Sequence, residues 1–415
     1  MNKNYIKASS YEAKIGQVKK VVLLYSGGLD TSVMLKWIQD NYKAKVIALT
    51  MDLGQQGDDL EFIKKKALNL GAEKIYVINV KDEFANEYIS KLIKANGAYQ
   101  GNYYISTISR YLMAKWAIKI AEQENADAIA HGCTGKGNDQ VRIEASALTL
   151  NPDIKIIAPV REWSMGRDEE IEYAAKNGIP VPVKKDFPYS VDDNMWGMTW
   201  ESGEIEDPSL IPPIEKFLNT HTLPENAPDK AEFIKIKFSK GIPVSINEKE
   251  MKLSDLIIKL NKIAGKHGVG IVHHIEDRLV GLKVRGVYEM PAAHVIMTAH
   301  KNLEKYVNTM TENELKNVMD IKWSYLVYGS KWYEPVLEAI NAFNDKINEK
   351  VEGEVTIKLY KGSAEVVAIT SPYALYDHNL ATFMKDYTFN QNASPGFVEI
   401  FSLQMKLANQ VKSKN

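Results

Sequence analysis

Residues 21–32 read VVLLYSGGLDTS, and this stretch decides the fold of the N-terminal part of the chain. Its first five residues are an apolar run typical of a buried parallel strand, and the residues over 31–42 predict a helix with one apolar side. The two glycines let the backbone approach an anion where a Cβ would block it. The hydroxyls of Ser26, Thr31 and Ser32, and the free N–H groups at the helix start, can donate to phosphate oxygens. The loop therefore predicts a phosphate site.

Strands and helices alternate on the C-terminal side of this loop. Further strands are expected at 45–52, 74–80, 128–130 and 154–158, and helices near 60–70, 82–95 and 107–125. Connections of this length imply right-handed crossovers and a parallel sheet covered on both faces. The sequence thus predicts an α/β nucleotide-binding domain over residues 1–165.

The alternation ends near residue 165, where a second domain is expected to begin. Eight prolines between residues 180 and 228 predict loops that wrap between domains. The pattern then predicts an α+β domain with a strand at 232–239, helices at 253–268, 291–309 and 311–326, and strands at 355–360 and 365–370. We expect this synthetase and multimerisation domain to span 166–395.

The final segment, 396–415, is expected to form a C-terminal arm. It holds large apolar side chains at Phe397, Ile400, Phe401, Leu403, Met405, Leu407 and Val411. These are too many for a free tail, so we expect the arm to take part in oligomerisation.

Composition excludes several classes of protein. The 415 residues carry a net charge of −1, so no broad electrostatic footprint for nucleic acid or an anionic membrane is expected. A single cysteine, Cys133, excludes a disulfide framework and a Cys-rich zinc site. No segment approaches the ~18 uninterrupted apolar residues of a membrane span, and the first 20 residues do not resemble a signal peptide. We expect a cytoplasmic protein without nucleic-acid or membrane partners.

A second motif, HGCTGKGNDQVR, occupies residues 131–142 after a predicted strand. Its three glycines make a loop that can fold closely around a ligand. Asp139 suits the ammonium group of an amino acid, and Arg142 suits a carboxylate through a bidentate contact. The alternative is a solvated glycine-rich loop whose Asn or Asp caps the next helix.

The first loop is not a Walker A motif, because the ending Gly-Lys-Ser/Thr is missing. Cleavage between the α and β phosphates of ATP is therefore favoured over transfer of the γ-phosphate. Between a strand and a helix, the loop resembles the pyrophosphate loop of the N-type ATP pyrophosphatases.

Six segments occur in the order SGGLDTS, HGCTGKGNDQVR, APVREW (158–163), PYSVDDN (188–194), KHGVGIVHHIEDRLVGLKVRGVYEMP (266–291) and KLYKG (358–362). This order resembles the argininosuccinate synthase family over nearly the whole chain. The resemblance implies a Rossmann-like adenine nucleotide α-hydrolase domain with a parallel sheet, and ligation of L-citrulline and L-aspartate with release of AMP and pyrophosphate. It also implies ATP with Mg²⁺ as substrate, no tightly bound cofactor, and a homotetramer.

Matching the family's motifs assigns three sets of residues. The ATP set is Leu24, Tyr25, Ser26, Gly27, Gly28, Leu29, Asp30, Thr31, Ser32, Met51 and Gly132. The aspartate set is Thr134, Asn138 and Asp139. The citrulline set is Tyr103, Thr107, Asn138, Arg142, Ser190, Thr199, Glu276 and Tyr288. No metal-ligating residue is assigned. The chain departs from the residues usual in the family at four positions: Ala is usual where Leu24 and Cys133 stand, Ser where Thr199 stands, and Asn where Asp277 stands.

Two other functions stay open at this point. Another N-type pyrophosphatase, such as a tRNA thiolase or an amidotransferase, would need sulfur-handling cysteines, a basic surface or a glutaminase domain. A nucleotide sensor without catalysis would bind ATP and release no pyrophosphate. Cys133 is interpreted as packing, and His273 and His274 as structural or surface residues. The aromatic residues of 323–333 are expected to form core or subunit contacts.

Overall fold

The computed structural model describes residues 13–57, 59–163, 165–180, 188–384 and 389–413. Backbone contacts divide the chain into two units, Met1–Tyr373 and Ala374–Asn415, and each is described by itself.

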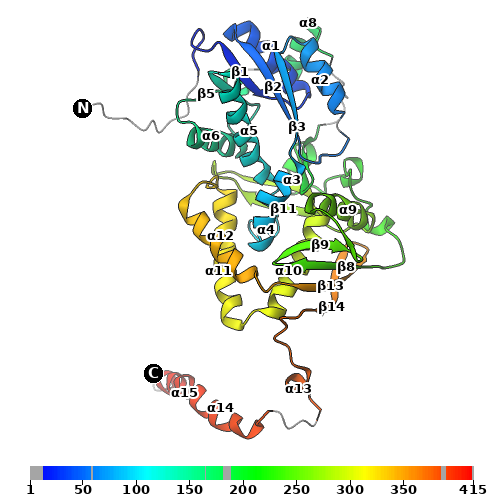
Figure 1. Ribbon diagram of the computed structural model, residues 1–415, viewed down its shortest axis with the longest axis vertical. Coiled ribbons are helices and arrows are strands. Elements are labelled where there is room, and N and C mark those ends of the chain that lie inside the picture. Colours follow the sequence, from blue (N-terminus) through cyan, green and yellow to red (C-terminus); the bar gives the residue numbers. More distant parts are fainter. Residues whose placement is uncertain (1–12, 58, 164, 181–187, 385–388, 414–415) are drawn as a thin grey trace, which may run out of the picture. The chain divides into compact units, whose positions relative to one another are not determined.

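The N-terminal part of the first unit contains a five-stranded parallel sheet in the order β3-β2-β1-β4-β5 (Figure 1). The strands are β1 (Lys20–Leu24), β2 (Lys45–Asp52), β3 (Lys74–Asn79), β4 (Ala128–Ala130) and β5 (Lys155–Ile157). All the expected strands form, and their ends agree with the prediction to within one residue. β1 lies in the centre of the sheet, because it pairs with both β2 and β4.

Helices cover both faces of this sheet. The helical segments are α1 (Leu29–Tyr42), α2 (Leu60–Asn69), α3 (Lys81–Glu83), a π-helix (Phe84–Ile89), α4 (Ser90–Lys94), a 3₁₀ turn (Ser106–Ile108), α5 (Ser109–Glu124), α6 (Asp139–Leu150), α7 (Pro159–Glu162) and α8 (Arg167–Lys176). Successive residues of a strand point to opposite faces. Accordingly, Val21 and Leu23 pack in the core around α1, whereas Val22 and Leu24 pack in the core that contains α5.

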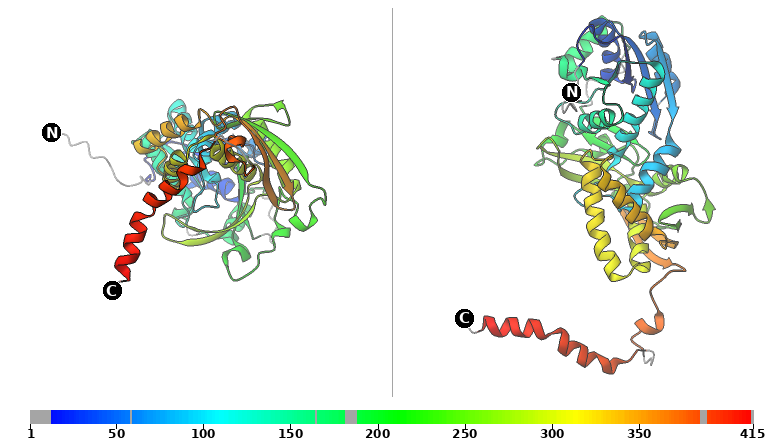
Figure 2. Two further views of the ribbon diagram at one scale, coloured as in Figure 1. Left: turned by 90° about the horizontal axis from the view of Figure 1, so that it is seen from below. Right: turned by 60° about the vertical axis from the view of Figure 1, so that its left-hand side comes forward.

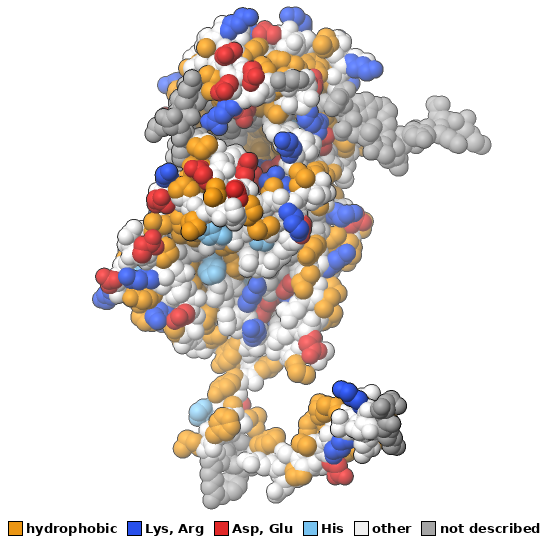
Figure 3. All heavy atoms as spheres, turned by 180° about the vertical axis from the view of Figure 1, so that it is seen from behind, with side chains coloured by type: hydrophobic (Ala, Val, Ile, Leu, Met, Phe, Trp, Pro, Cys, Tyr) orange, Lys and Arg blue, Asp and Glu red, His pale blue; other side chains and the backbone are white. Residues whose placement is uncertain are grey.

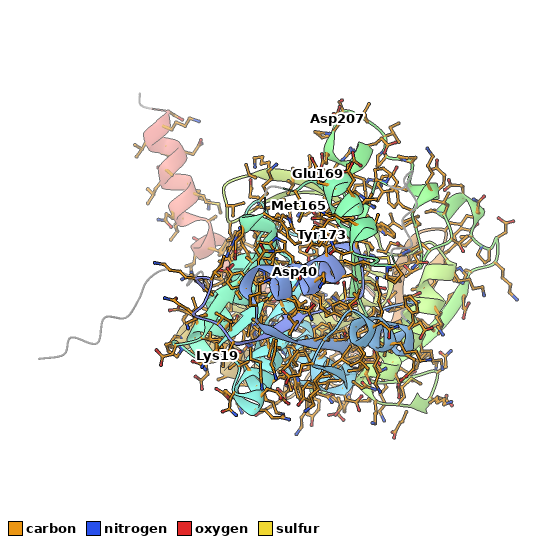
Figure 4. All side chains as sticks on the ribbon, turned by 90° about the horizontal axis from the view of Figure 1, so that it is seen from above. Lys19, Asp40, Met165, Glu169, Tyr173 and Asp207 are labelled. Carbon is orange, nitrogen blue, oxygen red and sulfur yellow. The ribbon has the colours of Figure 1, made fainter. Side chains whose placement is uncertain are left out.

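The helix α8 extends the layer on the α1 side beyond the expected domain boundary. The Tyr173 hydroxyl donates to Asp40 of α1 at 3.2 Å, and Figure 4 shows these two side chains next to each other. The core on the α5 side continues instead into the second half of the unit, where it includes residues such as Leu256 and Val295.

The second half contains an antiparallel sheet in the order β10-β9-β8-β13-β14. Its elements and neighbours are β8 (Glu232–Ser239), β9 (Ile242–Ile246), β10 (Lys249–Glu250), α9 (Leu253–Lys266), α10 (Pro291–Val307), α11 (Met310–Tyr328), α12 (Pro335–Asn348), β13 (Gly353–Tyr360) and β14 (Ser363–Thr370). The helices α9 and α10 contact this sheet and each other. The three expected strands and three expected helices of this region are confirmed, and β9, β10 and α12 are additional.

A third sheet was missed by the sequence analysis. It is antiparallel in the order β11-β12-β7-β6 and consists of β6 (Ser190–Asn194), β7 (Gly197–Glu201), β11 (Ile271–Asp277) and β12 (Lys283–Glu289). The expectation of loops throughout 180–228 was therefore wrong for 190–201. The edge strand β6, with the sequence SVDDN, lacks the apolar alternation by which a half-buried strand is recognised. Short 3₁₀ turns at Gly203–Glu206, Ile214–Lys216 and Pro224–Asn226 follow it.

The second unit contains the helices α13 (His378–Ala381), α14 (Ser394–Phe401) and α15 (Leu403–Lys412), with a 3₁₀ turn at Gln391–Ala393. Figure 2 shows α14 and α15 as successive helices. Their apolar side chains are exposed in the single chain, and Ile400 and Phe401 show 73% and 67% of their surface. The unit thus presents an uncovered apolar surface.

Acidic and basic side chains are interspersed on the face shown in Figure 3, in keeping with the net charge of −1. Among the helices in the described ranges, none is long and apolar enough to cross a membrane.

Candidate active site

The two glycine-containing motifs meet at the carboxyl end of the parallel sheet. One follows β1 and the other follows β4, and these neighbouring strands lie where the strand order reverses. Ligands bind at such a switch point in open α/β sheets. A Cβ added to Gly132 would lie 2.7 Å from the Met34 Cε of α1, so the backbone after β4 runs against the helix that starts at the first loop.

The two glycines of the first loop are required for different reasons. Gly27 has a φ of +80°, and a Cβ there would lie 2.9 Å from Ile63 Cγ1. The Lys66 ammonium also donates to the Gly27 carbonyl at 2.7 Å. Gly28 has a φ of −68°, and a Cβ there would meet only the Ser26 hydroxyl at 3.5 Å. Contacts within the protein thus explain why residue 27 is glycine, whereas a Cβ at position 28 would point into open space.

Gly28→Ala is therefore expected to raise the KM for ATP by about tenfold or more, because the new Cβ occupies the space that a phosphate would need. The melting temperature should change little, since φ is allowed and the cost at a helix N-cap is at most about 1 kcal/mol. Steady-state kinetics and thermal denaturation measure the two effects. Gly27→Ala is the contrasting variant and should lower stability as well. A wild-type KM for ATP in Gly28→Ala would contradict the assignment.

The hydroxyl groups of this loop differ in accessibility. The Ser26 and Thr31 hydroxyls lie 3.2 Å apart on exposed or half-buried residues. The Ser32 hydroxyl is buried and donates to the Gly28 carbonyl at 2.6 Å, so it holds the start of α1. No side chain caps this end of α1, and its backbone N–H groups remain for a ligand.

The remaining residues of the ATP set surround this loop. Leu24, Tyr25 and Met51 have buried side chains, which leaves their backbone for a nucleotide, and Leu29 is half-buried at the start of α1. The exposed Asp30 lies against Glu170 of α8. Burial, and then the Asp30 carboxylate, raise the pKa of Glu170 to about 8. Two carboxyl groups therefore adjoin the loop.

The second motif is organised by an ionic network. The Asp139 carboxylate accepts from Arg142 Nη1 at 2.7 Å and from Arg110 Nε at 2.8 Å. Arg110 also reaches Asp192 of β6, with Nη2 2.6 Å from Oδ2. Burial alone would raise the pKa of Asp139, but the two arginines overcome this effect and hold it at about 2. Asp139 is therefore a permanent anion that neutralises two buried cations.

Asn138 and Thr134 complete the aspartate set. The Asn138 side chain is buried, and its amide donates to the Tyr328 hydroxyl and accepts from the Leu279 N–H, both at 2.8 Å. Thr134 is exposed, in a turn closed by the bond from the Gly137 N–H to the Thr134 carbonyl at 3.3 Å. One residue is thus held firmly and the other faces solvent.

The strand register places much of the citrulline set on one face of the third sheet. Tyr288 pairs with Thr199, and Thr199 pairs with Asp192. Because alternate residues share a face, Glu276 of β11 and the exposed Ser190 of β6 lie on this face too.

The segment 103–107 packs against this face of the sheet. The Tyr103 ring stacks on Tyr288 with centroids 4.5 Å apart. The Tyr103 hydroxyl donates to the Thr107 hydroxyl at 3.2 Å, and the hydroxyls of Ser106 and Thr199 lie 3.5 Å apart. The citrulline residues are therefore brought together from four separate parts of the chain.

Glu276 is a buried carboxylate whose negative charge is only weakly compensated by a neighbouring cation. Its ion pair with Arg278 Nε is 3.5 Å long, whereas Arg278 Nη2 binds Glu201 at 2.7 Å. Burial and then Glu276 raise the pKa of Tyr288 well above its ordinary value. The surroundings therefore suit a cationic group next to Glu276.

Three residues of this region were missed by the sequence analysis. Arg110 lies at the start of α5, three residues after Thr107, and only its two ion pairs reveal its place. Tyr328 belongs to the aromatic segment that was expected to form core or subunit contacts. His274 is buried beside the stacked rings of Tyr103 and Tyr288, with centroids 6.4 and 6.1 Å away.

Neither Cys133 nor the His273–His274 pair forms a separate chemical centre in the structure. Burial raises the pKa of the Cys133 thiol, which keeps it protonated, in agreement with packing. In the part of the chain that the structure describes, no group of three or more His, Cys, Asp or Glu residues is arranged to hold a metal ion.

Comparisons with known proteins agree with this geometry. Residues 20–180 match the arginosuccinate synthase N-terminal HUP domain, and residues 189–408 match the arginosuccinate synthase C-terminal domain.

Curated relatives named argininosuccinate synthase align over nearly the whole chain. The protein from Symbiobacterium thermophilum is 50% identical over 398 residues, which cover 95% of this chain and 99% of the relative. The protein from Pyrococcus furiosus is 50% identical over 390 residues, or 94% of each chain. The protein from Brevibacillus brevis is 48% identical over 393 residues, or 94% of this chain and 93% of the relative. The chain therefore belongs to the argininosuccinate synthase family.

Proposed function

We propose that this chain joins L-citrulline and L-aspartate at the expense of ATP, with release of AMP and pyrophosphate, as the family does in arginine biosynthesis. The observation that carries the proposal is the meeting of three parts at the carboxyl end of β1 and β4. These parts are an anion loop, a charged loop at the start of α6, and a sheet face with a buried carboxylate among aromatic rings. Together they suit a nucleotide and two amino acids.

We assign ATP to the loop after β1, with Met51 and Gly132 beside the nucleotide. Thr134, Asn138 and Asp139 form the aspartate side. The citrulline side consists of Tyr103, Thr107, Asn138, Arg142, Ser190, Thr199, Glu276 and Tyr288. Arg142 has five N–H groups, of which three donate to the Tyr328 carbonyl and to Asp139. The guanidinium also hydrogen-bonds the Tyr111 side chain, and its charge suits a substrate carboxylate.

The chemistry proceeds in two steps through a citrullyl-AMP intermediate. The ureido oxygen of citrulline attacks the α-phosphate in line, and pyrophosphate leaves. The α-amine of aspartate then attacks the activated ureido carbon, and AMP leaves. Positioning and charge stabilisation supply most of the catalysis, because AMP is already a good leaving group.

Mg²⁺ accompanies ATP in this proposal and neutralises charge on its phosphates. The ion usually binds through phosphate oxygens, waters and one or two carboxylates, and Asp30 and Glu170 provide a carboxyl pair beside the loop. We propose no tightly bound cofactor, no nucleic-acid partner and a cytoplasmic location. We also propose three segments: a nucleotide-binding domain at 1–165, a synthetase and multimerisation domain at 166–395, and a C-terminal arm at 396–415.

The function is tested by measuring pyrophosphate release with ATP, citrulline and aspartate present together, and then with each substrate omitted in turn. The proposal is supported if pyrophosphate release requires ATP and citrulline. Formation of argininosuccinate should require aspartate as well. A nucleotide sensor would bind ATP without steady release of pyrophosphate.

Heavy oxygen in the ureido group of citrulline is expected to appear in AMP and not in pyrophosphate, because that oxygen becomes bound to the α-phosphorus. The loop lacks a Walker lysine and is suited to hold the β and γ phosphates as a leaving group. Mass spectrometry of the products measures the label. Label in pyrophosphate or orthophosphate would refute attack on the α-phosphate.

We also propose a homotetramer held partly by the arm. The arm exposes its apolar side chains in the single chain, and uncovered apolar surface of this kind marks a subunit contact. A chain that ends at Pro395 should therefore give a smaller particle in light scattering. A truncated chain with the full oligomer mass would contradict this role.

A further inference from the structure

Tyr328, at the end of α11, contacts both amino-acid sides of the site. Its hydroxyl accepts from Asn138 Nδ2 at 2.8 Å. Its backbone carbonyl accepts from Arg142 Nε at 3.3 Å and from Nη2 at 3.1 Å. The Arg142 guanidinium carbon also lies 4.8 Å from the centre of the Tyr328 ring. A single residue therefore bonds to Asn138, which is assigned to both amino acids, and to Arg142, which is assigned to citrulline.

The Tyr328 ring cannot easily turn away from these partners, because other rings hold it. It stacks on Tyr99 with centroids 3.5 Å apart and an angle of 2° between the planes. The Tyr103 ring meets it edge-on at 6.3 Å. The Tyr111 hydroxyl donates to the carbonyl of the preceding Val327, which also holds the backbone. Only 1% of the residue is exposed.

These contacts determine how the Asn138 amide is oriented. The Leu279 N–H can only donate, so the amide oxygen must face it. The amide nitrogen then faces the Tyr328 hydroxyl, where it has a buried acceptor. Without that hydroxyl, a buried N–H group would have no partner, and of these two contacts only the one from the Leu279 N–H would still hold the amide.

We propose that Tyr328 is a positioning residue for ligation, which orients Asn138 and Arg142 together and so aligns the aspartate and citrulline sides. This inference rests on the proposed function. The hydroxyl of Tyr328 acts on Asn138, and the backbone carbonyl of Tyr328 acts on Arg142. Asn138 is one of three residues assigned to aspartate but one of eight assigned to citrulline, so removal of the hydroxyl should affect aspartate more than citrulline and leave the ATP loop unaffected.

Tyr328→Phe removes the hydroxyl and keeps the ring and the carbonyl. We expect the KM for aspartate to rise by about tenfold or more, as for one unsatisfied buried N–H group. The KM for ATP should stay within about twofold, and the KM for citrulline should rise less than that for aspartate. Tyr325→Phe is the matched control, because it removes a hydroxyl from a half-exposed tyrosine one turn earlier in α11.

A second comparison separates positioning from a general loss of stability. In an Asn138→Ala background the hydroxyl has no amide to hold, so adding Tyr328→Phe should change the aspartate KM by less than about twofold. Full additivity in this cycle, equal effects of Tyr328→Phe and Tyr325→Phe, or equal rises in KM for all three substrates would overturn the proposal. If the wild-type protein does not ligate citrulline and aspartate, the proposed function itself fails before any variant is compared.

Discussion

Asp139→Asn is expected to lower kcat/KM for aspartate by a factor on the order of 10²–10³, because it removes the charge that two buried arginines share. Loss of one partner from a buried ion pair leaves uncompensated charge, at a cost of about 3–5 kcal/mol. Arg142 would lose its only carboxylate partner in the described structure, and Arg110 would keep only Asp192. The amide has nearly the size of the carboxylate, so packing is preserved.

Steady-state kinetics with each substrate varied in turn measure this effect. The KM for ATP should change much less than that for aspartate, because the ATP loop lies on another strand. Asp153→Asn, at an exposed position after α6, is the control and should behave like the wild type. Unchanged kcat and KM for aspartate in Asp139→Asn would refute the role of Asp139.

Glu276→Gln should lower kcat/KM for citrulline by a factor of roughly 10–150, which corresponds to about 1.5–3 kcal/mol for one charged hydrogen bond. Glu276 is buried and lies 3.5 Å from an arginine that binds Glu201 more closely. A citrulline ammonium group would therefore be its strongest partner. Glutamine keeps the shape of the side chain and removes the charge.

Asp277→Asn is the matched control for this experiment. Asp277 is the next residue of β11, so its side chain points to the opposite face of the sheet, where it pairs with Lys283 and Gln100. Equal effects of the two substitutions on citrulline kinetics would show that charge near the sheet, and not contact with Glu276, is what matters.

Local patterns in the sequence were sufficient to predict the parallel sheet and the glycine-containing loop that follows its central strand. The apolar run 21–25 and the alternation that follows it specify buried strands and crossovers, and connectivity then places the loops after β1 and β4 at one edge. The edge strand β6 was missed because its polar residues show no such alternation. The different reasons for Gly27 and Gly28 became clear only from the backbone angle and from the distance to Ile63.

The sequence by itself determined the family and the order of the strands and helices around the parallel sheet, because these depend on local pattern and on motifs. Only the tertiary structure decided that Arg110 joins Asp139 to Asp192, and that Tyr328 joins Asn138 to Arg142. The residues that bond directly in these two sets lie 29 to 190 positions apart in the chain. Such pairings arise when separate elements pack against one another, and no local pattern records which distant side chains will then lie within hydrogen-bonding distance.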